Sequence, residues 1–299
     1  MIISIMGLGT GIASIPYMVT LPGGMQWPSL GLGTWRMGES SGRRSAEVAA
    51  VRSALEMGYR LIDTAEMYGD GGAEEVMGAA LSEAFRTSAV SREDVVVVSK
   101  VHPHNASAAG VLAACERSLK RLRLDSIDTY LLHWRGAVPI AETVAAFESL
   151  RVSGRIRHWG VSNFDLDDMR ELVSVDGGSE CVTNQIYYSL TTRGPAYDLL
   201  PWQHAKGIVT MAYSPTDQGA LCKSSALQKL AGRMGASPAQ IALAWLIAQP
   251  GVMTIPKAVG LAHLADNFAA QALELSVEHL AELDASFPPP SRKQPLAMR

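Results

Sequence analysis

From residue 29 onward, short apolar runs alternate with longer segments in which apolar residues recur every three or four positions. The short runs are typical of buried β-strands, and the longer segments are typical of amphipathic helices. The predicted strands span residues 30–32, 60–63, 95–100, 129–133, 158–161, 182–185, 209–213 and 253–255. The predicted helices lie near residues 44–57, 72–86, 107–122, 139–152, 165–174, 196–205, 237–248 and 261–268. The pattern therefore predicts a strand–helix unit that is repeated along the chain.

Eight such units favour an α/β fold of the closed (β/α)8 type, the TIM barrel, which takes about 250 residues. The four valines at 95–98 are apolar on both faces, as is typical of a parallel strand covered by helices. An open, doubly wound sheet is the alternative. The turn sequence Leu-Pro-Gly-Gly within residues 18–28 predicts an N-terminal β-hairpin across the barrel floor. Although length alone suggests two domains, we expect residues 18–299 to form a single barrel domain.

Residues 1–17 are apolar and uncharged, which invites interpretation as a signal peptide. A signal peptide needs a positively charged start, whereas the first basic residue of this chain is Arg36. The Gly7-Leu8-Gly9 sequence does not complete a dinucleotide-binding motif, because position 12 is an isoleucine. We expect residues 1–17 to be a dispensable extension, with an additional N-terminal strand as the alternative.

The composition of the 299 residues excludes several classes of protein. With 47% hydrophobic and 18% charged residues, and without a long apolar run, the chain is predicted to be globular rather than disordered or membrane-spanning. A net charge of −3 offers no basic surface for nucleic acid. The three cysteines, Cys115, Cys181 and Cys222, are too few and too far apart for a disulfide framework or a structural zinc site. We therefore expect a cytoplasmic protein, a monomer that binds a small molecule and no metal.

Polar and aromatic residues stand where the predicted strands end. They are Asp63, Lys100, His133, Ser162 with Asn163, Gln185 and Tyr213, and the loop after the second strand adds Tyr68. Taken singly, each of them has an ordinary structural explanation. An aspartate or a lysine can belong to a structural ion pair, and a histidine can be a residue of the core. In a (β/α)8 barrel, however, the carboxyl ends of the strands all face one mouth. Polar groups at so many successive strand ends therefore predict a shared active site.

Aspartate, tyrosine, lysine and histidine together suit one kind of proton transfer. A tyrosine hydroxyl, with a pKa of about 10, is a weak acid at neutral pH. A neighbouring ammonium stabilises tyrosinate and so lowers that pKa, and a carboxylate holds the lysine in place. A histidine can hydrogen-bond a carbonyl oxygen and polarise the carbonyl group. The set predicts proton delivery to a carbonyl oxygen while its carbon receives a hydride.

Several motifs, taken in order, closely resemble the aldo-keto reductase family over residues 18–287. They are Ile-Asp-Thr-Ala-Glu-Met-Tyr-Gly at 62–69, Val-Ser-Lys at 98–100, Tyr-Leu-Leu-His-Trp at 130–134, Gly-Val-Ser-Asn at 160–163, Thr-Asn-Gln at 183–185, Ala-Tyr-Ser-Pro at 212–215 and Ile-Pro-Lys at 255–257. The sequences Gly-Thr-Trp-Arg-Met-Gly-Glu at 33–39 and Asp-Leu-Leu-Pro-Trp at 198–202 are most similar to bacterial members that reduce methylglyoxal and other small carbonyls with NADPH.

The resemblance implies a role for each member of the polar set. Tyr68 would be the general acid, Lys100 the partner that lowers its pKa, and Asp63 the anchor of the lysine. His133 would orient the carbonyl group, and a histidine rather than a glutamate at this position fits carbonyl reduction. Trp35 and Trp134 would be walls of the substrate pocket.

The resemblance also implies a cofactor, NADPH, with NADH as a weaker substitute. Ser162, Asn163 and Gln185 would hydrogen-bond the nicotinamide carboxamide, and Tyr213 would stack on the ring. At the adenosine end, a helix N-terminus offers free N–H groups to phosphate. The full set of implied cofactor contacts is Gly33, Thr34, Ser162, Asn163, Gln185, Tyr213, Ser214, Lys257, Ala258, His263 and Asn267.

The chain departs from the family pattern at the adenosine end and at its C-terminus. Ala258 and His263 stand where many NADPH-dependent members have serine and arginine, which predicts a weaker preference for NADPH over NADH. After the last helix only residues 287–299 remain, whereas steroid-handling relatives have longer, apolar tails. This shorter tail favours an open pocket for small polar carbonyls.

Two functions from different classes are compatible with the resemblance. The first is NADPH-dependent reduction of small aldehydes and 2-oxoaldehydes such as methylglyoxal. The second is a redox-sensing or regulatory subunit that binds the cofactor on the same fold with little turnover. The presence of Asp63, Tyr68, Lys100 and His133 favours the enzyme, because a sensor does not need a fast acid.

We expect a chain that starts at Met18 to fold and turn over substrate like the full chain, because residues 1–17 contribute none of the predicted site groups. The check is to compare melting temperature and turnover for the two chains. A marked fall in melting temperature on truncation would instead show that residues 1–17 pack on the barrel.

Overall fold

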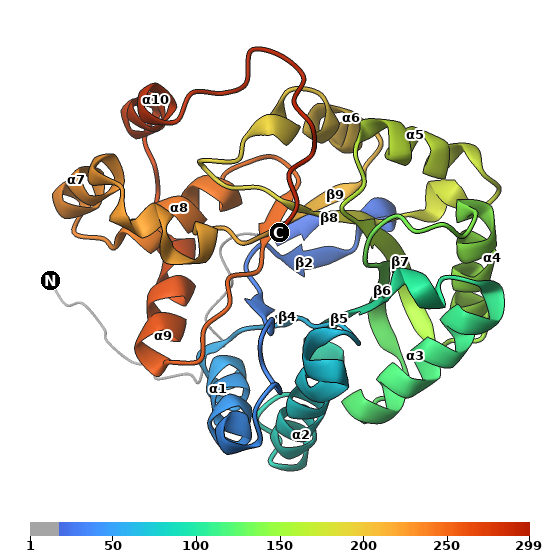
Figure 1. The fold of residues 1–299 in the computed structure, drawn as a ribbon. Coiled ribbons are helices and arrows are strands. Elements are labelled where there is room, and N and C mark those ends of the chain that lie inside the picture. The colour runs from blue at the N-terminus through green and yellow to red at the C-terminus, as the bar shows by residue number, and fades with distance from the viewer. Residues whose placement is uncertain (1–17) are drawn as a thin grey trace, which may run out of the picture.

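The computed structural model describes residues 18–299 (Figure 1). The expected extension at residues 1–17 lies outside the described residues. Parallel strands form the centre of the fold, and most helices form a ring around them (Figure 1). The structure therefore has the layering that is typical of a (β/α)8 barrel.

The eight-stranded sheet found within residues 18–299 is parallel and follows chain order from β3 to β10. Its strands are β3 (Leu32–Gly33), β4 (Leu61–Asp63), β5 (Val96–Val101), β6 (Ile127–Leu132), β7 (Ile156–Ser162), β8 (Thr183–Tyr187), β9 (Val209–Tyr213) and β10 (Val252–Thr254). Leu30 bridges Thr254 and Gly33 bridges Lys257, so the first and last strands meet. A Cβ atom at Gly33 would lie 2.7 Å from the carbonyl oxygen of Ile255, so the close approach at this seam requires glycine. The predicted barrel is confirmed.

The eight predicted helices are all present, with ends within a few residues of the predicted ones. They are α1 (Arg44–Met57), α2 (Gly72–Arg86), α3 (Ala108–Leu122), α4 (Ile140–Val152), α5 (Leu166–Ser174), α6 (Leu199–Ala205), α8 (Pro238–Ile247) and α9 (Leu261–Ala269). The prediction was incomplete, because it did not include α7 (Ser225–Met234) or α10 (Val277–Ser286). These two helices lie outside the ring (Figure 1), so a repeat of strand–helix units gives no position for them.

The predicted N-terminal hairpin is also present. Strand β1 (Met18–Thr20) pairs antiparallel with β2 (Gln26–Pro28). The buried side chains of Val19, Leu21 and Trp27 form one apolar cluster with barrel residues such as Leu61 and Val209, which begin their strands. The hairpin therefore covers the amino-terminal end of the strands, and the opposite end remains for the polar groups. No helix in residues 18–299 is both long and apolar enough to cross a membrane.

Replacing Trp27 by alanine should lower the free energy of unfolding by about 3–5 kcal/mol, because it removes a large side chain that is 2% exposed and leaves a cavity in the barrel floor. Activity measured well below the melting temperature should stay unchanged, since the polar groups lie at the other end of the strands. Denaturant unfolding of both proteins checks the prediction. Val152→Ala, at an 83% exposed position, is the control and should cost less than about 0.5 kcal/mol.

Candidate active site

The strands bring the predicted polar residues to one end of the barrel. Asp63 ends β4, Ser162 ends β7 and Tyr213 ends β9, and Lys100 and Gln185 lie within two residues of the ends of β5 and β8. His133 directly follows β6, and Tyr68 begins the short 3-10 helix η3 (Tyr68–Gly71) after β4. Because the strands are parallel and in sequential order, these carboxyl ends meet at the mouth.

Lys100 is the centre of the proposed catalytic group, which consists of Asp63, Tyr68, Lys100 and His133. It is fully buried, and its ammonium donates to both carboxylate oxygens of Asp63, at 2.7 and 2.8 Å. It also donates to the carbonyl oxygen of Thr64 at 2.8 Å and to the Tyr68 hydroxyl at 3.3 Å. Every proton of the ammonium therefore has a partner, and one of these partners is the predicted acid.

Burial governs the protonation of this group. It raises the pKa of Asp63 and lowers the pKa of Lys100, and the charge of each partner opposes the shift of the other. Burial also raises the pKa of Tyr68 well above its usual 10, and the negative charge of Asp63 adds to this rise. The role of Lys100 as the group that lowers the pKa of Tyr68 stays a prediction: its ammonium lies 3.3 Å from the hydroxyl, where a positive charge favours tyrosinate, and so opposes the rise caused by burial and Asp63. Tyr68 carries its proton at neutral pH, as a proton donor must.

His133 lies beside Tyr68, with ring centroids 5.6 Å apart, and is 8% exposed. Burial lowers the pKa of His133 well below 6.5, and the positive charge of Lys100 acts in the same direction. The imidazole is therefore neutral at physiological pH. Its Nδ1 has no hydrogen-bond partner among residues 18–299, so ring contacts with Tyr68 and Trp134 keep it in place.

A second polar group lies beside the first, at the ends of β7, β8 and β9. The Asn163 side chain donates to the carbonyl oxygen of His133 at 3.1 Å and accepts from the Tyr213 hydroxyl at 2.9 Å. Asn163 has a φ of 60°, a left-handed conformation that asparagine tolerates better than most residues. The Ser162 hydroxyl donates to the carbonyl oxygen of Gln185 at 2.8 Å. Short polar side chains and one aromatic face thus gather at one place.

Gln185 connects the two groups. Its amide nitrogen donates to Asp63 at 2.7 Å, so the predicted carboxamide-binding residue also contacts the carboxylate that holds Lys100. Thr34 belongs to the same network, because its hydroxyl donates to the carbonyl oxygen of Asp63 at 3.0 Å. The predicted cofactor contacts of Gly33 and Thr34 stay predictions, since here these residues form the barrel seam and support Asp63.

The two predicted substrate walls lie at the mouth. Trp134 is partly buried, with its ring centroid 5.0 Å from that of His133. Trp35 is 39% exposed, and the guanidinium of Arg36 lies 4.4 Å from its ring centroid. Trp134 therefore contacts His133 of the proposed catalytic group, whereas Trp35 is partly exposed to solvent.

The predicted adenosine-end residues lie around the loop from β10 to α9. Lys257 is exposed and bridges Gly33, Ala258 is buried, and His263 is exposed in the first turn of α9. Asn267 is 8% exposed on the same helix, and Ser214, with a φ of 50°, follows β9. Partial burial lowers the pKa of Lys257. The positive charges of Arg43 and Arg36 act in the same direction, and the negative charges of Glu47 and Glu39 oppose the shift. These residues stay proposed cofactor contacts.

The short C-terminal tail returns to the mouth, which sequence reasoning did not foresee. The chain end lies over the barrel centre in Figure 1. The backbone N–H of Arg299 donates to the Tyr213 hydroxyl at 3.2 Å, and its guanidinium lies 4.9 Å from the ring centroid of Tyr187. Tyr187 in turn stacks on Tyr213, with centroids 5.8 Å apart. The short tail predicted an open pocket, but the contacts of Arg299 make the pocket less open on this side.

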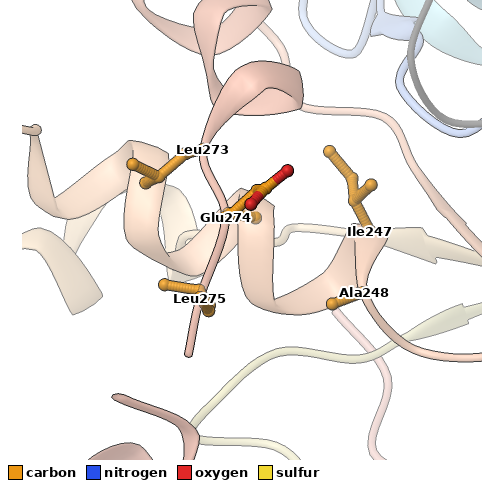
Figure 2. Close-up of a pocket in the computed structure, with 6 residues that line it drawn as sticks. Ile247, Ala248, Leu273, Glu274 and Leu275 are labelled. Carbon is orange, nitrogen blue, oxygen red and sulfur yellow. The ribbon is translucent and has the colours of Figure 1, made fainter. Parts of the chain in front are cut away.

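Two cavities lie outside this constellation. One, of about 240 Å³, is lined by Ala244, Ile247, Ala248, Leu273, Glu274 and Leu275 (Figure 2). It contains none of the predicted site residues, so it is separate from the candidate active site. The other, of about 420 Å³, is lined by Glu66, Met67, Asp70, His102 and Arg121, next to the loop that carries Tyr68. Within residues 18–299, no three histidine, cysteine or acidic side chains are placed to bind a metal ion together.

Comparisons with known proteins agree with this geometry. Residues 29–287 match the model of the Aldo/keto reductase family. Methylglyoxal reductase YeaE of Escherichia coli is 47% identical over 286 residues, which are 94% of this chain and 98% of that protein. Glyoxal reductase of Bacillus subtilis is 35% identical and covers 91% of this chain and 93% of its own length. A crystal structure of aldo/keto reductase from Klebsiella pneumoniae in complex with NADP and acetate has a TM-score of 0.89, at 46% identity, and covers 95% of this chain and 99% of that one.

Proposed function

Since the chain belongs to the aldo/keto reductase family, we propose that it reduces small aldehydes and 2-oxoaldehydes such as methylglyoxal to alcohols with NADPH. The observation that carries the proposal is the contact of a buried Lys100 with both Asp63 and Tyr68, next to a neutral His133. Two relatives are named methylglyoxal reductase and glyoxal reductase, and a similar structure contains NADP, which supports both substrate class and cofactor.

The carbonyl oxygen would lie between Tyr68 and His133. The neutral imidazole can donate one hydrogen bond to that oxygen, which polarises the carbonyl group without adding a charge to the site. Tyr68 then gives its proton to the oxygen as negative charge develops there. The tyrosinate that is left lies 3.3 Å from the Lys100 ammonium, which stabilises it until a proton is regained.

The residues of the second group fit a nicotinamide. A carboxamide has both a donor and an acceptor, and Ser162, Asn163 and Gln185 offer both kinds of group at one end of the barrel. The ring of Tyr213 is a flat surface of suitable size for stacking. NADPH supplies the hydride that reduces the carbonyl carbon. Gln185 contacts Asp63, so a nicotinamide bound at this group would also affect the position of the carboxylate that holds Lys100.

The walls and the tail support a small substrate. Trp134 lies against His133, and the C-terminal Arg299 lies against Tyr213, so the mouth is bounded on both sides of the proposed reacting centre. Methylglyoxal, with few atoms and two carbonyl groups, fits such a mouth more readily than a steroid does. The regulatory alternative is not favoured, because the complete set of proposed proton-transfer residues is connected, from Asp63 through Lys100 and Tyr68 to His133.

Tyr68→Phe should retain the fold and NADPH binding but reduce turnover of methylglyoxal by several orders of magnitude, since general acid catalysis alone contributes about 10²–10⁴-fold. Steady-state kinetics and cofactor binding on the purified variant check this. Wild-type turnover in Tyr68→Phe would exclude Tyr68 as the acid.

The pH dependence of the wild-type enzyme should follow from the raised pKa of Tyr68. Reduction needs the protonated phenol, so its rate should persist through neutral pH and fall as the pH rises through the pKa of Tyr68. Alcohol oxidation needs tyrosinate as the base and should rise over the same alkaline range. Initial rates in both directions across the alkaline range test this, and parallel profiles for the two directions would contradict the assignment.

Ala258→Ser combined with His263→Arg should tighten NADPH binding about tenfold or more, because a charge-assisted hydrogen bond is worth about 1.5–3 kcal/mol and a neutral one about 1 kcal/mol. NADH binding should not change, since it has no 2′-phosphate.

Quenching of tryptophan fluorescence gives the dissociation constants for both cofactors. The gain should be confined to NADPH, because arginine can donate two hydrogen bonds to the 2′-phosphate. If the double variant binds NADPH no more tightly than the wild type, positions 258 and 263 do not contact the 2′-phosphate.

A further inference from the structure

Glu66 is a largely buried carboxylate for which the proposed reaction has no use. It lies between Asp63 and Tyr68 in the chain, and its side chain is 8% exposed. One oxygen, Oε1, accepts from the backbone N–H of His102 at 2.8 Å and from the side-chain amide of Asn105 at 2.9 Å. The other, Oε2, pairs with Arg117 at 3.3 Å. All three partners belong to the next strand–helix unit.

The backbone of the loop that carries Tyr68 is bonded to the same unit. The N–H of Glu66 donates to the carbonyl oxygen of Lys100 at 3.3 Å, and the N–H of Thr64 donates to that of Val98 at 2.9 Å. Tyr68 then follows within one turn, with its N–H donating to Ala65 at 3.1 Å. Tyr68 and Lys100 thus lie on two segments that are bonded to each other. Their 3.3 Å contact therefore depends on how these segments are aligned.

The bond to His102 affects the other side of the site. The His102 ring contacts Trp134 edge to face, with centroids 4.8 Å apart, and Trp134 contacts His133 at 5.0 Å. A change in the backbone position of His102 would therefore move the ring that contacts the proposed substrate wall. Glu66 is connected in this way to both the acid and the carbonyl-orienting histidine.

The two loops meet at the surface of the molecule. A hollow of about 420 Å³ is lined by Glu66, Met67 and His102, and Met67 is 43% exposed. Arg117 is 49% exposed, and an ion pair with so exposed a partner contributes little. The two bonds to Oε1 contribute more than this ion pair, because they join a desolvated carboxylate to the neighbouring loop. They add side-chain bonds beyond the ends of the strands to the backbone bonds of Thr64 and Glu66.

We propose that Glu66 is a positioning residue of this reductase, which aligns Tyr68 with Lys100 and supports the Trp134 wall through the bonds of Oε1 to His102 and Asn105. The inference rests on the proposed function. It adds a role for a residue that touches neither the proposed substrate nor the cofactor.

Glu66→Ala should lower kcat for methylglyoxal by about 10- to 100-fold, as expected for a displacement of about 1 Å between reacting groups. Glu66→Gln keeps an acceptor oxygen in the place of Oε1 and should restore kcat to within about threefold of the wild type. Arg117→Gln is the matched control, since it removes only the exposed ion pair, and it should behave like the wild type. The dissociation constant of NADPH should stay within about twofold in all three variants, because Glu66 contacts none of the proposed cofactor residues.

The pH profile separates positioning from loss of stability. If Tyr68 loses its contact with Lys100 in Glu66→Ala, its pKa rises further, so the alkaline rise of alcohol oxidation should shift to higher pH. Glu66→Gln should not show this shift. A lower melting temperature with unchanged kcat and an unchanged profile would overturn the proposal, because Glu66 would then be only structural. A Glu66→Gln variant as slow as Glu66→Ala would also overturn it, because the ion pair with Arg117 would then be what matters.

Hydrogen–deuterium exchange tests the same bonds without turnover. Residues 64–68 and 100–105 should exchange faster in Glu66→Ala than in the wild type, and Glu66→Gln should resemble the wild type. Equal exchange in all three proteins would overturn the inference whatever their activity. If the exchange difference is present but the wild type does not reduce methylglyoxal, the proposed function fails, and the alignment of the two loops by Glu66 is supported.

Discussion

An ammonium group inside a protein needs a partner for each of its protons, because an unpaired buried charge costs several kcal/mol. Lys100 meets this requirement with Asp63, the carbonyl oxygen of Thr64 and the Tyr68 hydroxyl. Removing one member of such a buried pair typically costs about 3–5 kcal/mol. The contacts that stabilise the buried charge of Lys100 therefore also align Tyr68, the proposed acid. The same hydrogen bonds serve both the stability of the fold and the proposed reaction.

The rest of the mouth is built outward from this pair. Gln185 donates to Asp63 and so connects the proton-transfer residues with the group that suits a nicotinamide. Asn163 extends the connection to Tyr213 on one side and to the backbone of His133 on the other. On the opposite side of the pair, Glu66 binds the loop after β5. A substitution of one residue in this network is expected to change the positions of several others, because each residue has more than one contact within it.

The two ends of the barrel have different tasks. At the amino-terminal end, Trp27 and its neighbours on the hairpin close the interior with apolar side chains. At the carboxyl end, the interior is filled by Asp63, Lys100 and Gln185, which are buried polar residues that require each other. The apolar end contributes stability without specific chemistry, whereas the buried charged and amide groups of the polar end need particular hydrogen-bond partners.

Much of the fold and of the candidate site could be predicted from the sequence, since both depend on local patterns. Apolar runs that alternate with helical periodicity predicted eight strand–helix units, and the residues at the strand ends predicted which side chains would meet. The resemblance to the family supplied the proposed roles of Tyr68, Lys100 and His133. The helices α7 and α10 were not predicted, because they do not belong to the repeated unit.

Only the tertiary structure decided the electrostatics and the long-range contacts. Burial and the charge of Asp63 raise the pKa of Tyr68, and both depend on packing rather than on residue type. The same holds for the return of Arg299 to Tyr213 and for the bonds of Glu66 to His102. These partners are distant along the chain or belong to different loops, and nothing in a local pattern specifies their distance. The sequence by itself determined which groups reach the mouth, and the fold determined which of them are close enough to change each other's charge.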